Sequence, residues 1–126
     1  LLLRLEINPE SRVKVARALA RPVLRRGAWV RFRIEIDNAA RTTARLRASS
    51  PQAPAQPGAR DRWLDLRLEP DTPLSGRPRE SRTLLLRARD AGWREATLAF
   101  DVGQGTQDLG FRGEVAALFR CEEQTP

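Results

Sequence analysis

RTLLLRARDAGWREATLAFDV, residues 82–102, is the stretch that decides the fold of this chain. It contains two runs in which every second residue is apolar, and the turn-forming residues 90–92 separate them. Because successive side chains of a strand point to opposite faces, each run has one apolar face that a second layer must cover. The apolar positions are Leu84, Leu86, Ala88, Ala96, Leu98, Phe100 and Val102. The sequence therefore predicts two facing sheets.

Other parts of the chain show the same two-residue period. These segments are residues 1–7, 12–18, 28–37, 42–48, 62–69 and 111–121. The first two are joined by a turn and are expected to pair as a hairpin, although residues 16–19 also permit a short helical turn. Pro22 lacks a backbone donor, so we expect an edge strand or a crossing segment there. We predict an all-β, antiparallel sandwich of seven to eight strands, with residues 28–37 central in their sheet.

The alternation also predicts which side chains share the interior. Phe32, Leu86, Phe100 and Phe119 are expected to meet there, with the small residue Cys121 on the same face as Phe119. Other positions are expected to face outward. These are Trp29, Arg31, Arg33, Trp63, Asp65, Arg67 and Glu69.

The length of 126 residues fits one domain, which we place at residues 1–121 with a polar tail at 122–126. The composition is 40% hydrophobic and 31% charged, which indicates a globular chain. We expect a soluble protein without a membrane span. The chain begins with Leu and contains no Met, so we expect that it was processed or cut from something longer.

The net charge of +7 has two interpretations. Arginines can attract nucleic acid or another polyanion, or they can simply fill exposed strand positions. Their spread along the chain favours the second interpretation. If the neighbouring strands pair as expected, Arg45 and Arg47 face Glu95 and Asp101. Asp65 and Glu69 likewise face Arg87 and Arg89, so that many arginines have a partner within the chain.

The chemistry available for catalysis is limited. The chain has no histidine, no tyrosine and a single cysteine, Cys121, so it can form neither an internal disulfide nor the usual structural zinc sites. Arrangements that need a positioned imidazole are excluded as well. We therefore expect a protein that is not an enzyme and that uses no metal or other cofactor. The compartment's redox state stays open.

Two loops are candidate sites. Residues 103–108 begin like a glycine-rich nucleotide loop but lead into a strand, so we expect a plain connection; a calcium site with Asp101 and Asp108 is the alternative. Residues 49–59 hold three prolines and a glycine without an apolar period, which predicts an irregular surface loop. That loop is expected to be disordered or to make a contact.

One group of side chains is a candidate binding surface. Trp29, Arg31 and Arg33 are predicted on one outward face, and Trp63 and Trp93 are further aromatic candidates. Trp93 lies at a turn, where we expect it to be buried against the end of the sandwich. Together the five residues could form an aromatic and basic platform for a polyanion or a carbohydrate. Packing, contact with a protein partner or a solvated face is the alternative, which the sequence favours.

The overall pattern resembles an immunoglobulin-like or fibronectin-like sandwich. In such domains a Gly-x-Tyr element often precedes the penultimate strand; here Gly92, Trp93 and Arg94 stand in its place, so the tyrosine corner is missing. The paired cysteines of antibody domains are missing too. Residues 27–32, 36–38 and 101–112 also resemble the accessory sandwich that precedes a PHP-type metallohydrolase domain in some large bacterial proteins. That resemblance implies a non-catalytic module beside a larger enzyme.

These observations predict a non-catalytic module that packs against a neighbouring domain or subunit, including a second copy of the chain, as a scaffold or accessory domain. The alternative is a module that binds a polyanion or carbohydrate. We expect an extracellular or cell-surface location.

Overall fold

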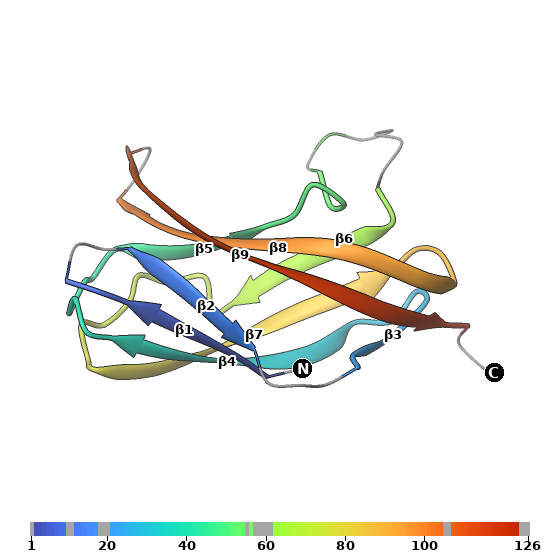
Figure 1. Ribbon diagram of the computed structural model, residues 1–126, viewed down its shortest axis with the longest axis horizontal. Helices are drawn as coiled ribbons and strands as arrows, with labels where there is room; N and C mark the ends of the chain where they lie inside the picture. Colours follow the sequence, from blue (N-terminus) through green and yellow to red (C-terminus); the bar gives the residue numbers. More distant parts are fainter. Residues whose placement is uncertain are drawn as a thin grey trace.

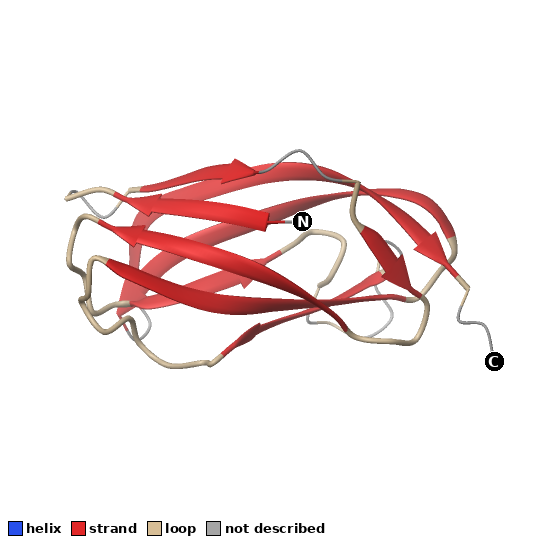
Figure 2. Cartoon of the chain, turned by 90° about the horizontal axis from the view of Figure 1, so that it is seen from below, coloured by secondary structure: helices blue, strands red, loops and turns tan. Residues whose placement is uncertain are grey.

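The computed structural model describes residues 2–9, 12–17, 21–54, 56, 62–104 and 107–123. Among these residues all regular structure is β-strand, as Figure 2 shows. The strands are β1 Leu2–Ile7, β2 Val13–Arg17, β3 Val23–Arg25, β4 Val30–Asn38, β5 Arg45–Ser49, β6 Leu64–Glu69, β7 Arg79–Ala88, β8 Gly92–Gln104 and β9 Gln107–Glu122. The prediction of seven to eight strands is wrong by one: β3, with three residues, is too short to show an alternating pattern.

The strands form two layers (Figure 1). One sheet has five strands in the order β2-β1-β4-β7-β6, and the other has four in the order β3-β9-β8-β5. The predicted all-β sandwich is confirmed, as are the β1–β2 hairpin, the central position of β4 and the edge position of the strand after Pro22. The purely antiparallel arrangement is wrong, because β1 runs parallel to β4 and β3 runs parallel to β9.

The turn between β7 and β8 carries the chain from one sheet to the other. Gly92, where β8 begins, has a φ of 107°, which a residue without a Cβ adopts at little cost. The two apolar runs of residues 82–102 therefore face each other across the core instead of pairing edge to edge.

Aromatic side chains pack together at the centre of the core. Phe32, Leu86, Phe100 and Phe119 are all buried in one cluster, as predicted. The rings of Phe32 and Phe119 meet edge to face at 6.5 Å. Trp63 was predicted to face outward, which is wrong: it is 8% exposed and lies edge-on to Phe119 at 6.3 Å. It precedes β6, so the alternation within that strand does not determine its direction.

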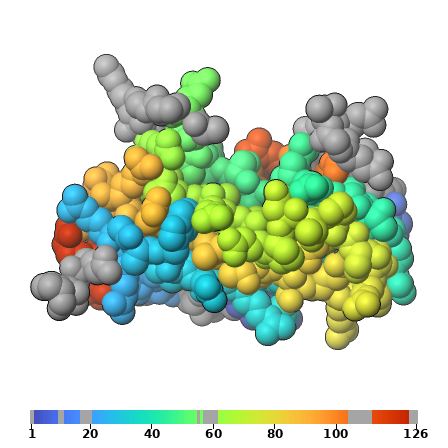
Figure 3. Space-filling model, turned by 180° about the vertical axis from the view of Figure 1, so that it is seen from behind, coloured from blue at the N-terminus to red at the C-terminus, as the bar shows by residue number. Residues whose placement is uncertain are grey.

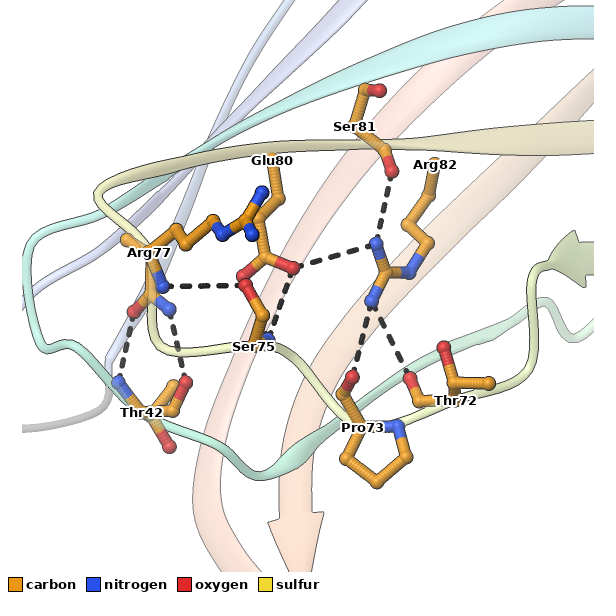
Figure 4. Close-up of polar contacts among 9 residues, drawn as sticks. Thr42, Thr72, Pro73, Ser75, Arg77, Glu80, Ser81 and Arg82 are labelled. Carbon is orange, nitrogen blue, oxygen red and sulfur yellow. Dashed lines mark hydrogen bonds and ion pairs between the residues drawn. The ribbon is translucent and has the colours of Figure 1, made fainter.

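Polar side chains close one end of the core, where β7 begins (Figure 4). Arg82 is a charged residue, but it lies on the inner side of β7 with Leu84 and is only 8% exposed. Its guanidinium donates hydrogen bonds to the carbonyl oxygens of Ser81 at 3.0 Å and Pro73 at 3.3 Å. Glu80 accepts a hydrogen bond from the backbone N–H of Ser75 at 3.0 Å. These contacts attach the β6–β7 connection to the sandwich, because a buried guanidinium must find acceptors.

The edge strand β2 of one sheet closely approaches β9 of the other sheet. A Cβ atom placed on Gly113 in β9 would lie 2.7 Å from a methyl group of Val15 and 2.8 Å from the carbonyl oxygen of Val13. Carbon atoms pack without repulsion at about 3.5 to 4.0 Å, so only glycine fits between these strands.

We predict that Gly113→Ala lowers the free energy of unfolding by about 1 to 3 kcal/mol, because the new methyl group has to push β2 away from β9. Chemical denaturation measures the change. Ala116→Ser, at an exposed position of the same strand, is the control and should stay within about 0.5 kcal/mol of the parent chain. Equal stability of Gly113→Ala and the parent chain would contradict the close approach.

Candidate functional site

The five predicted binding residues do not form one platform. Trp63 is in the core, and Trp93 lies on β8 in the four-stranded sheet. Trp29, Arg31 and Arg33 occupy the outer side of the five-stranded sheet, at and just before β4. Arg31 and Arg33 are exposed, while Trp29 is half-buried. The structure therefore brings together only three of the five.

The chain's own arginines already stack on the indole of Trp29. The guanidinium carbon of Arg87 lies 4.4 Å from the ring centroid, and that of Arg67 lies 5.6 Å from it. Both distances are within the range of a cation–π contact. The indole therefore acts as a support for two guanidinium groups, which leaves less of the ring for a base or a sugar.

Three arginines surround one buried carboxylate beside this indole; we call Arg62, Asp65, Arg87 and Arg89 the Asp65 cluster. Asp65 is 7% exposed although it lies on the outer side of β6, because the arginines cover it. Nε of Arg87 donates to it at 3.0 Å and Nε of Arg89 at 3.1 Å. Nη2 of Arg62 donates to it at 3.3 Å.

The electrostatic balance at Asp65 favours the ionised form. Burial by itself raises the pKa of Asp65, but the hydrogen bonds and positive charges of Arg89 and Arg87 outweigh burial and leave the pKa below its usual value. The carboxylate is therefore charged at neutral pH and holds the three arginines in fixed positions.

The predicted charge pairs are confirmed in part. Asp65 faces Arg87 across β6 and β7, and Arg47 faces Asp101 across β5 and β8 with Nε and Oδ1 2.9 Å apart. Two partners differ from the prediction. Arg45 contacts Asp71 at 2.6 Å, and Glu69 contacts Arg67 at 3.6 Å.

The segment after β5, residues 50–54, is hydrogen-bonded to both sheets beside the Asp65 cluster. The side-chain oxygen of Gln52 accepts a hydrogen bond from the backbone N–H of Thr97 in β8 at 2.9 Å. The carbonyl oxygen of the same residue accepts one from the N–H of Leu64, the first residue of β6, at 3.3 Å. The prediction of an irregular loop is confirmed for residues 50–54; residues 55 and 57–59 lie outside the described part of the chain.

A cavity of about 330 Å³ lies between this segment and the cluster. Its lining combines apolar side chains with the four charged residues of the Asp65 cluster: Trp29, Ala53, Pro54, Arg62, Leu64, Asp65, Leu66, Arg87 and Arg89. In Figure 3 the lime surface of β6 adjoins the blue-to-cyan surface around the start of β4 and the green surface of the segment after β5. We call this hollow the Trp29 cavity.

A second candidate surface lies on the outer side of the four-stranded sheet. Trp93 is 57% exposed, Leu118 is 51% exposed and Val23 is 39% exposed. The expected burial of Trp93 is wrong, because the residue lies within β8 and on its outer side. Trp93 and Val23 both pair with Arg120 of β9, one from each side, and Leu118 is two residues away on the same strand. Three neighbouring strands thus present their largest exposed apolar side chains together. We call Val23, Trp93 and Leu118 the Trp93 patch.

Among the residues that the structure describes, the remaining candidate positions offer no additional chemistry. Cys121 is buried, as predicted, and burial raises the pKa of its thiol, which disfavours the reactive thiolate. Asp101 is engaged by Arg47, and the side chain of Asp108 lies outside the described residues, so the calcium alternative has no structural support. Among the residues described, no group of three or more possible metal ligands is found, and no helix is long and apolar enough to cross a membrane.

Sequence reasoning missed two features of these surfaces. Arg62 contacts Asp65 but precedes β6, and the rules of cross-strand pairing apply only to residues within paired strands. The exposure of Leu118 had a signal in the sequence: Ala117, Phe119 and Cys121 share the inner face, so a large apolar residue between them must point to solvent.

No known protein-family model and no curated protein matches this sequence. Among solved structures, the chain is similar to domains 4 and 5 of the S-layer protein SbsC, with 13% identity and a TM-score of 0.48 over 84% of this chain and 49% of that one. A longer SbsC structure, rSbsC(31-844), has 12% identity and a TM-score of 0.49 over 90% of this chain and 15% of that one. PapD-like domain 7 of human CEP192 has 11% identity and a TM-score of 0.48 over 83% and 79%. The chain spans less than half of each of the two SbsC structures.

We predict that Asp65→Asn lowers the free energy of unfolding by about 2 kcal/mol at neutral pH, because the amide leaves the three arginines without their counter-charge. The folded state lowers the pKa of Asp65, so its stabilising effect is complete above the ordinary aspartate pKa of about 4 and is lost as the pH falls through the folded pKa.

The difference in the free energy of unfolding between Asp65→Asn and the parent chain should therefore shrink below about pH 4, as measured by urea denaturation across a pH series. Glu69→Gln is the matched control, because Glu69 is an exposed carboxylate paired with a single arginine; it should cost less than about 1 kcal/mol at every pH. A cost for Asp65→Asn that does not depend on pH would contradict the assigned role.

Proposed function

We propose that this chain is a non-catalytic β-sandwich module that binds a protein surface, either a neighbouring domain or another subunit, through the Trp93 patch. The observation that carries the proposal is the exposure of Trp93, Leu118 and Val23 side by side on one face. A single exposed apolar residue is ordinary, but large apolar residues that gather on adjacent strands are characteristic of a contact surface.

The residues around the patch suit a protein partner. Tryptophan and arginine are the side chains most enriched at the centres of protein interfaces, and Trp93 lies beside Arg120. Arg120 contacts Glu122 at 3.2 Å, so its charge is partly balanced before any partner arrives. Glu95, which is exposed and pairs with Leu118, would contribute to a polar rim.

The alternative of a polyanion or carbohydrate platform receives less support. It needs an aromatic face free for stacking, and Trp29 is occupied by Arg87 and Arg67. Arg33 lies 3.7 Å from Glu35, which Arg4 also contacts, so the positive charge of this face is offset locally. The cell-surface location and the PHP-type neighbour stay predictions from the sequence.

Site-specific photo-crosslinking tests the proposal. A photoreactive amino acid at position 118 in the protein produced by its source cells should give a discrete protein crosslink, identified by mass spectrometry. The substitution Trp93→Ser in the same protein should reduce that crosslink by tenfold or more, because a central tryptophan typically contributes about 2 kcal/mol or more to an interface.

The matched control places the photoreactive residue at position 69, an exposed site on the other sheet. It should give no discrete product. Crosslinking from position 118 that is no stronger than from position 69, or that is unaffected by Trp93→Ser, would refute the proposed surface.

A further inference from the structure

The Trp29 cavity carries an excess of positive charge. Arg62, Arg87 and Arg89 line it, and Asp65 is the only carboxylate among those lining residues that the structure describes. The four charges sum to +2, because guanidinium groups are ionised at any physiological pH and the pKa of Asp65 is lowered. Asp65 orients the arginines, but it neutralises only one of them.

The arginines also retain unused hydrogen-bond donors. A guanidinium carries five N–H donors, and the contacts with Asp65 use one from Arg62, one from Arg87 and two from Arg89. Nε of Arg62 is buried without a partner among the described residues. The donors on the Nη atoms of these arginines that Asp65 leaves unused are therefore the ones available to an anion in the cavity.

We propose that the Trp29 cavity is a binding site for a small phosphate monoester. The dianion of such a group matches the charge of +2, and its oxygens match the paired donors of a guanidinium. The volume of about 330 Å³ lies at the lower end of the range for small-molecule pockets. Trp29, Leu66 and Pro54 supply apolar walls for the organic part of the ligand.

The site is separate from the surface proposed for protein binding. The cavity is lined by β6, β7 and the segments beside them, whereas the Trp93 patch lies on the outer side of the four-stranded sheet. Binding of a phosphate monoester therefore neither requires nor excludes a protein partner, and the two proposals can fail independently.

Phenyl phosphate is a suitable probe, titrated into the 126-residue chain and followed by calorimetry and by the NMR signals of the Trp indole and Arg Nε–H groups. We expect one saturable site, with the largest shifts at Trp29, Arg62 and Arg87. Arg62→Gln should weaken binding by roughly tenfold, because it removes a charged donor. Asp65 keeps Arg87 and Arg89 in this variant, so the fold should survive, which circular dichroism checks.

Arg67→Gln is the matched control. Arg67 stacks on the same indole, but it does not line the cavity, so its loss should change the affinity less than twofold. Lowering the pH from roughly 7.5 to roughly 5.5 should also weaken phenyl phosphate binding, because the second pKa of a phosphate monoester is about 6. Phenyl sulfate, a monoanion at both values, should bind weakly and without this pH dependence.

Three results would overturn the proposal. The first is the absence of saturable binding by the parent chain. The second is an equal loss of affinity in Arg62→Gln and Arg67→Gln, which would indicate general attraction to a basic surface. The third is a set of NMR shifts centred on Arg31 and Arg33, which would place the anion on the outer face of β4; this result does not depend on any variant folding.

Discussion

The edge-to-face contacts of Phe119 hold the two layers of this molecule together. Phe119 projects from β9 of one sheet and meets Phe32 of β4 in the other, while Trp63 packs against it from the segment before β6. Offset aromatic pairs of this kind add to the free energy gained from apolar burial. Trp63 directly follows Arg62 and lies two residues before Asp65, so its contact with Phe119 also helps to position these two members of the Asp65 cluster.

Much of the fold could be predicted from the alternation of apolar residues, because period two is a direct consequence of strand geometry. The interior positions of β4, β7, β8 and β9 were found in this way, and so were the pairs Arg47–Asp101 and Asp65–Arg87. The failures have local causes. Strand β3 is three residues long, and Trp63 stands just outside a strand. The parallel pairings β1–β4 and β3–β9 depend on how the chain returns between the layers, which no residue pattern records.

The site was less predictable than the fold because its parts come from several segments. Trp29, Asp65 and Arg87 lie on three different strands or their flanks, and Arg62 and Pro54 come from the connection between β5 and β6. Sequence reasoning selected Trp29 for its exposure, whereas the structure gives it a supporting role beneath Arg87. The arginines of this chain are thus arranged in two ways. Some, such as Arg47, pair with one carboxylate on a neighbouring strand, whereas three share the single carboxylate of Asp65.

The hydrogen bonds of Gln52 have a consequence for solubility. Strand β5 stops pairing with β8 at Ser49, and the side-chain amide of Gln52 then takes over as the acceptor for Thr97. The backbone of the same residue engages β6 at the margin of the other sheet. Edge strands with unpaired backbone groups are the places where strands of other chains can pair and where aggregation can begin. A single glutamine therefore shields one corner of both sheets from edge-to-edge aggregation.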